Sequence, residues 1–133
     1  MNENTFVKDI TFLCQTFDPK SNKFEHLPVT KQATFKELSQ TDPKQHKLFF
    51  LMFPLFVMQT TANGEERIVA DPEILHNLTL KAIDCLLIVD EGFTIQDKKE
   101  FTNDALALLR FGQWFLAEKF TAFFLNFNQS YKG

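Results

Sequence analysis

The side chains best suited to metal binding or nucleophilic attack are few and widely spaced in this sequence. The three histidines are His26, His46 and His76, and none has a Cys, Asp or Glu at ligand spacing on a shared helix face. The two cysteines, Cys14 and Cys85, fit no zinc or redox spacing and lie in apolar stretches. This pattern predicts buried structural thiols, a reducing compartment and no metal site.

Two pairs of adjacent carboxylates could supply a general acid and a general base. Glu65-Glu66 and Asp90-Glu91 each lie beside a glycine, however, which is typical of turns. Nothing in the sequence selects either of them as a glycosidase-type pair. The four glycines are too dispersed for a phosphate-binding loop, and no serine lies in a Gly-x-Ser-x-Gly elbow. We therefore expect no catalytic residue and no bound cofactor.

Phenylalanine is the unusual feature of the composition, with 17 Phe against one Trp and one Tyr. Phe carries a large apolar surface and no polar group, so it favours burial in a core or against a partner. Between residues 111 and 127 aromatic side chains are so dense that a helix there would be apolar around most of its circumference. Two interpretations stay open: the stripe is core, or its outer part docks on another protein. The second predicts five protein-binding residues, which are Arg110, Trp114, Phe120, Phe124 and Phe127.

The elements that would position these residues begin with a β-hairpin over residues 5–29. The period-two pattern of its first strand places four side chains on one face: Phe6, Ile10, Phe12 and Cys14. Residues 18–22 form a turn cluster between the two strands.

Helical patterns follow the hairpin. We expect helices over residues 30–40, from residue 43 to about residue 53, over residues 72–89, and from residue 95 to about residue 127 with a bend at Gly112. Residues 54–70 are predicted to be a loop or a short second hairpin around Asn63-Gly64. The predicted fold is α+β and mainly helical: one domain over residues 1–133, with the hairpin, about four or five packed helices within residues 30–127, and a polar tail at residues 128–133.

Charge and hydropathy limit the partners and the cellular location that we expect for the protein. The net charge is −3, without the clustered basic surface that phosphate backbones need, so we do not expect nucleic acid as a partner. The N-terminus does not read as a secretory signal. The longest apolar run, residues 48–58, is too short to span a bilayer and contains Pro54, so we expect no membrane span and a cytoplasmic protein.

The order of segments resembles the small tail- or baseplate-assembly chaperones of tailed bacteriophages. The resemblance rests on hairpin strands at residues 10–13 and 24–28, a polar helix opening at residues 29–38, and apolar helices that end in an aromatic-rich one. It implies a non-catalytic protein that shields a self-associating structural protein or sits in a tail complex, in the host cytoplasm or the virion. The dense C-terminal Phe and the segment 48–58 depart from the pattern, and no functional residue is carried over.

The sequence thus predicts a non-enzymatic protein-binding factor that acts in phage assembly and binds a structural or host protein. A homo-oligomer is also compatible, because a symmetric interface could bury the excess Phe. Two alternatives stay open: a small inhibitor of a host defence complex, and an unrecognised small enzyme that uses dispersed carboxylates or histidines.

Overall fold

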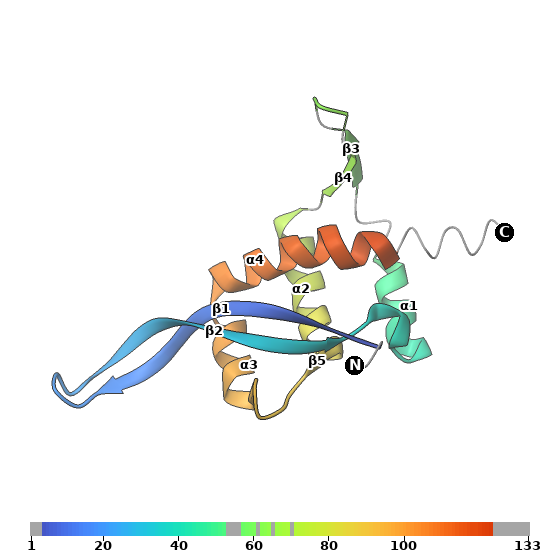
Figure 1. Ribbon diagram of the computed structural model, residues 1–133. Coiled ribbons are helices and arrows are strands. Elements are labelled where there is room, and N and C mark those ends of the chain that lie inside the picture. Colours follow the sequence, from blue (N-terminus) through green and yellow to red (C-terminus); the bar gives the residue numbers. More distant parts are fainter. Residues whose placement is uncertain (1–3, 53–56, 61, 65, 70, 124–133) are drawn as a thin grey trace.

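A long two-stranded ribbon dominates the architecture (Figure 1). The computed structural model describes residues 4–52, 57–60, 62–64, 66–69 and 71–123. Strands β1 (Thr5–Asp18) and β2 (Lys23–Lys36) pair antiparallel without a bulge, from Thr5 opposite Lys36 to Asp18 opposite Lys23. At the turn, the Asp18 carboxylate accepts hydrogen bonds from the Lys20 backbone N–H and the Ser21 hydroxyl. The predicted hairpin and its turn are therefore confirmed.

Two shorter pieces of sheet complete the strands. β5 (Leu87–Ile88) pairs with Thr34 and Phe35 on the far side of β2, which makes a three-stranded antiparallel sheet in the order β1-β2-β5. β3 (Val57–Thr60) and β4 (Glu66–Val69) form a separate hairpin that rises from the helices in Figure 1. Gly64 lies between these strands with φ +82°, a left-handed conformation that glycine adopts without strain.

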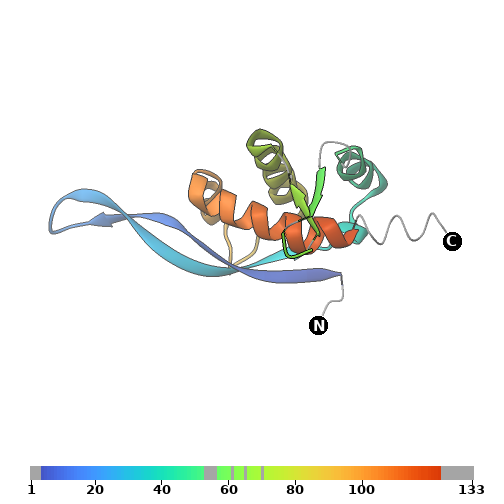
Figure 2. The ribbon, with the colours of Figure 1, turned by 90° about the horizontal axis from the view of Figure 1, so that it is seen from above.

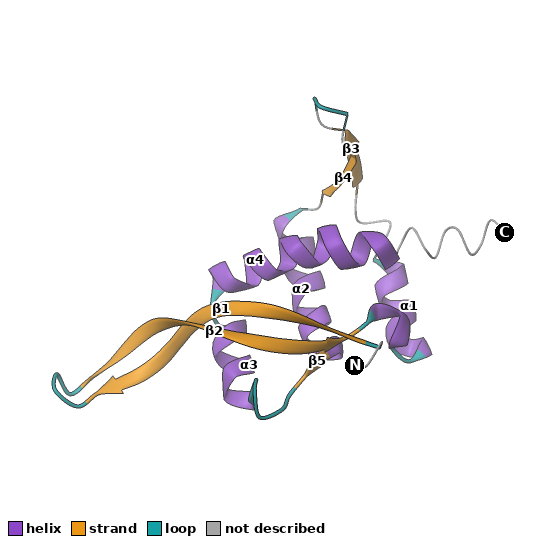
Figure 3. Ribbon diagram, viewed as in Figure 1, coloured by secondary structure: helices purple, strands orange, loops and turns teal. Residues whose placement is uncertain are grey.

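Helices cover the inner face of the ribbon near its base (Figure 3). The α-helices are α1 (Pro43–Leu51), α2 (Pro72–Leu86), α3 (Ile95–Thr102) and α4 (Ala105–Phe115). A 3₁₀ turn, η1 (Leu38–Gln40), precedes α1, and a π-helical turn, η3 (Leu116–Phe120), continues α4. The predicted capping box at the start of α3 is present, since Thr94 and Asp97 each bond the other's backbone N–H.

Aromatic rings join the ribbon to the helices. Phe12 packs against Phe93 and Phe101 with ring centroids 5.7 and 6.4 Å apart, and Phe35 stacks on Phe111 at 5.0 Å. Geometry of this kind adds stabilisation to the burial of the rings themselves. The remaining members of the core are Ile10, Ala33, Leu38, Phe49, Leu75, Leu78, Ala82, Ile83, Leu86, Ala107, Leu108, Phe115, Leu116, Phe120 and Phe123.

The predicted balance of the fold is wrong. The described chain is α+β with a three-stranded antiparallel sheet and four α-helices, and its strands hold nearly as many residues as those helices. The main error lies at residues 30–40, where β2 continues to Lys36 and only a 3₁₀ turn follows. Ala33 and Phe35 point inward two residues apart, which is strand spacing, and β1 supplies a partner along the whole length of β2.

Two other predicted helices end earlier than expected. The helix predicted over residues 72–89 stops at Leu86, because Leu87 and Ile88 leave it to pair with β2. The long helix predicted from residue 95 breaks at Asn103 and restarts at Ala105, capped by the Asp104 carboxylate. The predicted polar tail at residues 128–133 lies outside the described residues.

α4 continues through Gly112, which lets α4 approach α2 closely. A Cβ added at Gly112 would overlap the Thr79 hydroxyl oxygen. Thr79 is buried and donates its hydroxyl to the Leu75 carbonyl at 2.7 Å, so it has little freedom to move aside.

We expect Gly112→Ala to lower the free energy of unfolding by about 1–3 kcal/mol, the usual cost of overpacking a core. This cost should exceed the roughly 1 kcal/mol that Ala gains over Gly in helix propensity. Urea denaturation measures the difference. Gln113→Ala, at an exposed neighbouring position, is the control, and Thr79→Ala should relieve part of the loss in the double variant. Equal or greater stability of Gly112→Ala would contradict the close approach.

Candidate protein-binding site

The structure places three of the five residues predicted to bind a partner, and these three do not share one surface. Arg110 is exposed on α4 and Trp114 is half-buried one turn later, and both border the same hollow. Phe120 has no exposed surface and belongs to the core. Phe124 and Phe127 lie outside the described residues. The structure therefore groups Arg110 with Trp114 and removes Phe120 from the surface.

Two carboxylates fasten the outer edge of β1 to the helices. The backbone N–H of Leu13 donates to Asp104 Oδ2 at 2.9 Å, and that of Gln15 donates to Glu100 Oε2 at 3.0 Å. The other oxygen of Asp104 accepts from the backbone N–H groups of Leu106 and Ala107. One side chain thus caps α4 and binds the strand, which closes this part of the edge of β1.

A third carboxylate, that of Asp97, binds the ribbon through β2. Asp97 is buried, and Lys31 Nζ donates to both of its oxygens at 2.9 and 3.0 Å. Burial alone would raise the pKa of Asp97, but the hydrogen bonds from Thr94 and Lys31 outweigh it and lower the pKa. The pKa of Glu100 is also lowered, first by the hydrogen bond from Gln96 and then by interactions with Cys14 and the Gln15 backbone. Asp97, Glu100 and Asp104 together form the carboxylate clamp.

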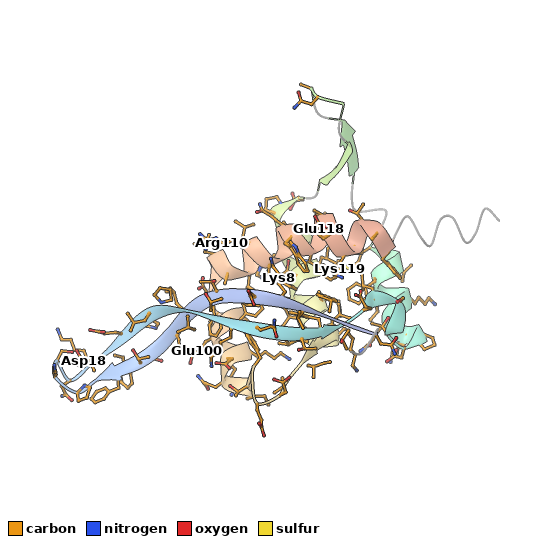
Figure 4. All side chains as sticks on the ribbon, viewed as in Figure 1. Lys8, Asp18, Glu100, Arg110, Glu118 and Lys119 are labelled. Carbon is orange, nitrogen blue, oxygen red and sulfur yellow. The ribbon has the colours of Figure 1, made fainter. Side chains whose placement is uncertain are left out.

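A groove runs between the edge of β1 and α4 next to this clamp. Its hollow of about 190 Å³ is lined by four consecutive strand residues, 8–11, and by one side of α4. Lys8 lies over the Trp114 ring, with Nζ 4.7 Å from the ring centroid. In Figure 4, Lys8 and Arg110 project from the two elements that border this groove. Its charged side chains are two cations, Lys8 and Arg110, and one anion, Asp9.

The outer half of the ribbon forms a projecting arm, residues 15–28, which extends beyond the helices when the molecule is viewed from above (Figure 2). Phe17 and Phe24 face each other across its strands with ring centroids 5.3 Å apart, and their exposed fractions are 51% and 64%. Leu13, at the base, lies on the same face four residues before Phe17 in β1. Leu27 is exposed on the opposite face. The arm therefore carries exposed apolar side chains on both faces, and no described element covers them.

Sequence reasoning missed both the groove and the arm. The period-two pattern that places Ile10 and Phe12 inward also places Leu13 and Phe17 outward, and this outward pair was the available signal for the arm. No local pattern could reveal the groove, because its two walls are about a hundred residues apart in the chain.

The remaining reactive side chains are dispersed. Both cysteines are half-buried free thiols. The interaction with Glu100 raises the pKa of Cys14, and burial raises that of Cys85, so each thiol is less ionised than usual. Within the described part of the chain, no three His, Cys, Asp or Glu side chains gather closely enough to hold a metal ion.

Comparison with known proteins adds no relative: no protein-family model, curated protein or solved structure matches the chain. The resemblance to phage assembly chaperones therefore stays a prediction. In the described residues, none of the helices has the length and apolarity to cross a membrane.

The carboxylate clamp should make stability depend on pH. Folding lowers the pKa of Asp97 and Glu100, so their stabilisation is complete above the unfolded-state pKa, about 4, and is lost as the pH falls through the folded-state pKa. We expect the urea midpoint of the wild type to fall steeply below about pH 4. Asp97→Asn/Glu100→Gln should be less stable at pH 7 and show a flatter acid limb. An unchanged acid limb would contradict this role of the clamp.

Phe120 gives a second test, since it separates a core residue from a surface one. We expect Phe120→Ala to lower the free energy of unfolding by about 3–5 kcal/mol, because it leaves a cavity beneath η3. Thermal denaturation followed by circular dichroism measures the loss. Wild-type stability of the variant would show that Phe120 is not part of the core.

Proposed function

We propose that the protein is a non-catalytic protein-binding factor that engages its partner through the projecting arm. The observation that supports this most directly is the exposed Phe17–Phe24 pair on a ribbon that extends away from the body of the molecule. Contiguous apolar side chains on a surface mark interaction sites, and exposed Phe has no polar group through which water could solvate it favourably.

The construction of the arm favours a partner that covers it. A two-stranded ribbon without a third strand or a helix packed against it is only marginally stable in water. Side chains on both faces of this arm, Phe17 and Phe24 on one and Leu27 on the other, would gain from burial. A protein surface with an apolar cleft fits both needs at once.

The charges of the arm do not favour nucleic acid. Lys20 and Lys23 are balanced by Asp18 and Glu25, so the arm offers no basic surface to a phosphate backbone. The carboxylates of the clamp bind backbone N–H groups and Lys31 and so serve the fold. These observations support binding rather than chemistry.

The biological setting remains a prediction from the order of segments. Assembly of a phage tail or baseplate, in the host cytoplasm or the virion, is the first setting, and inhibition of a host defence complex is the second. The identity of the partner distinguishes them, because the first requires a structural tail protein and the second a host nuclease or defence protein.

The arm is tested with Phe17→Ser/Phe24→Ser. Both side chains lie outside the core, so this variant should keep its fold, with a stability change near the roughly 0.5 kcal/mol typical of surface substitutions. We expect the tagged wild type to capture a defined partner from its native cells, identified by mass spectrometry, and the variant to lose most of it.

Leu51→Ser/Ile95→Ser is the matched control, since these apolar side chains are also exposed but lie on α1 and α3. The control should retain the partner. Sedimentation equilibrium of the purified wild type shows whether that partner is a second copy of the chain. Equal capture by the arm variant and the control would contradict the proposal.

A further inference from the structure

We propose that the groove between β1 and α4 binds an extended peptide, which adds as a strand to the open edge of β1 and presents a carboxylate to Arg110. This site is separate from the exposed aromatic pair of the arm and uses backbone groups rather than an apolar face. The two proposals can therefore succeed or fail independently.

The edge of β1 offers unpaired backbone groups in the groove. The N–H groups of Leu13 and Gln15 point away from β2, as their bonds to the clamp show. The register is continuous along the ribbon, so Val7, Asp9 and Thr11 present their N–H and C=O groups on the same side. No other strand of the described chain pairs with this edge, and no backbone hydrogen bond of these three residues on that side is found within the described residues.

The other edges of the sheet are less suited to adding a strand. The even-numbered residues of β2 direct their backbone N–H and C=O groups away from β1, toward the outer edge of the sheet. Pro28 is one of these residues and has no N–H, so this edge lacks a donor there. β5 covers the same edge near Thr34. On β1 the carboxylate clamp occupies the outward N–H groups of Leu13 and Gln15. The open stretch is therefore short and lies beside α4.

The wall of the groove indicates what kind of peptide fits. Arg110 makes no ion pair within the described residues, and it lies one helical turn before Trp114 on the side of α4 that faces β1. One turn of four residues rises about 6 Å, and two residues of an extended chain span about 6.6 Å. Side chains at positions i and i+2 of an added strand thus match Arg110 and Trp114.

The chemistry of these two side chains sets the sequence of the ligand. A guanidinium pairs with a carboxylate through charge-assisted hydrogen bonds, and the half-buried Trp114 ring suits an apolar side chain. Lys8 adds positive charge above the Trp114 ring, and the negative charge of Asp9 in the groove lining offsets part of it. The expected motif is an acidic and an apolar residue separated by one position, in an otherwise extended segment.

The test uses a displayed library of random linear 12-residue peptides panned on the full-length protein. Enriched peptides without Trp are synthesised and titrated by fluorescence, because Trp114 is the only Trp of the chain and lies in the groove. We expect enrichment of the acidic–x–apolar pattern in either direction and a saturable change in Trp114 emission. No enrichment over a blank surface, or binding without a fluorescence change, would overturn the proposal.

Asp9→Pro and Gln32→Pro form a matched pair of variants. The two residues are opposite each other in the ribbon, so each Pro removes one outward N–H, on the groove side for Asp9 and on the far side for Gln32. We expect Asp9→Pro to weaken peptide binding about tenfold or more and Gln32→Pro to leave it unchanged. Equal affinity of Asp9→Pro and Gln32→Pro would count against strand addition.

Two further measurements apply even if a Pro variant fails to fold. Arg110 is exposed on α4, so Arg110→Ala should leave the fold intact. The variant should bind acidic peptides about tenfold more weakly, with little effect on the binding of peptides whose acidic residue is replaced by its amide. N-methylation along the best peptide should weaken binding at alternate positions, since an added strand directs every second N–H to β1. Uniform effects along the peptide, or a ligand indifferent to Arg110, would overturn the proposal.

Discussion

The ribbon depends on carboxylates that bind its backbone from outside the sheet. A two-stranded ribbon cannot satisfy its outer edges by itself, and β5 covers only two residues of β2. Asp104 and Glu100 accept N–H groups of β1, and Asp97 holds Lys31 of β2. Because Asp104 and Asp97 also cap helices, the beginnings of α4 and α3 are set by the same side chains that position the ribbon.

The abundance of Phe has two structural uses. Inside, rings such as Phe12, Phe35 and Phe111 fill the space between the sheet and the helices, and the close approach of α2 and α4 at Gly112 leaves no room for more volume there. Outside, Phe17 and Phe24 lie on the arm, where no part of the described chain covers them. The same residue type therefore fills the core at one end of the ribbon and forms an exposed apolar pair at the other.

The distribution of open and closed edges links the fold to the proposed function. Exposed strand edges invite unwanted pairing, and proteins block them with proline, charges or covering elements. Here Pro28, β5 and the carboxylate clamp block parts of the perimeter. The stretch from Val7 to Thr11 stays open beside α4. An open edge next to a half-buried Trp, and to an Arg that makes no ion pair with the described residues, favours recognition of an extended segment.

By itself the sequence determined the local features: the hairpin turn at residues 18–22, the Asn-Gly turn, and the helix starts at Pro72 and Thr94, because each rests on neighbouring residues. It could not determine the length of β2, since Ala33 and Phe35 suit a helix or a strand until β1 pairs with them. Only the tertiary structure decided that Phe120 is core, that Arg110 and Trp114 share a groove with β1, and that the arm is uncovered. Burial and edge pairing depend on contacts between segments far apart in the chain, and a local pattern does not contain them.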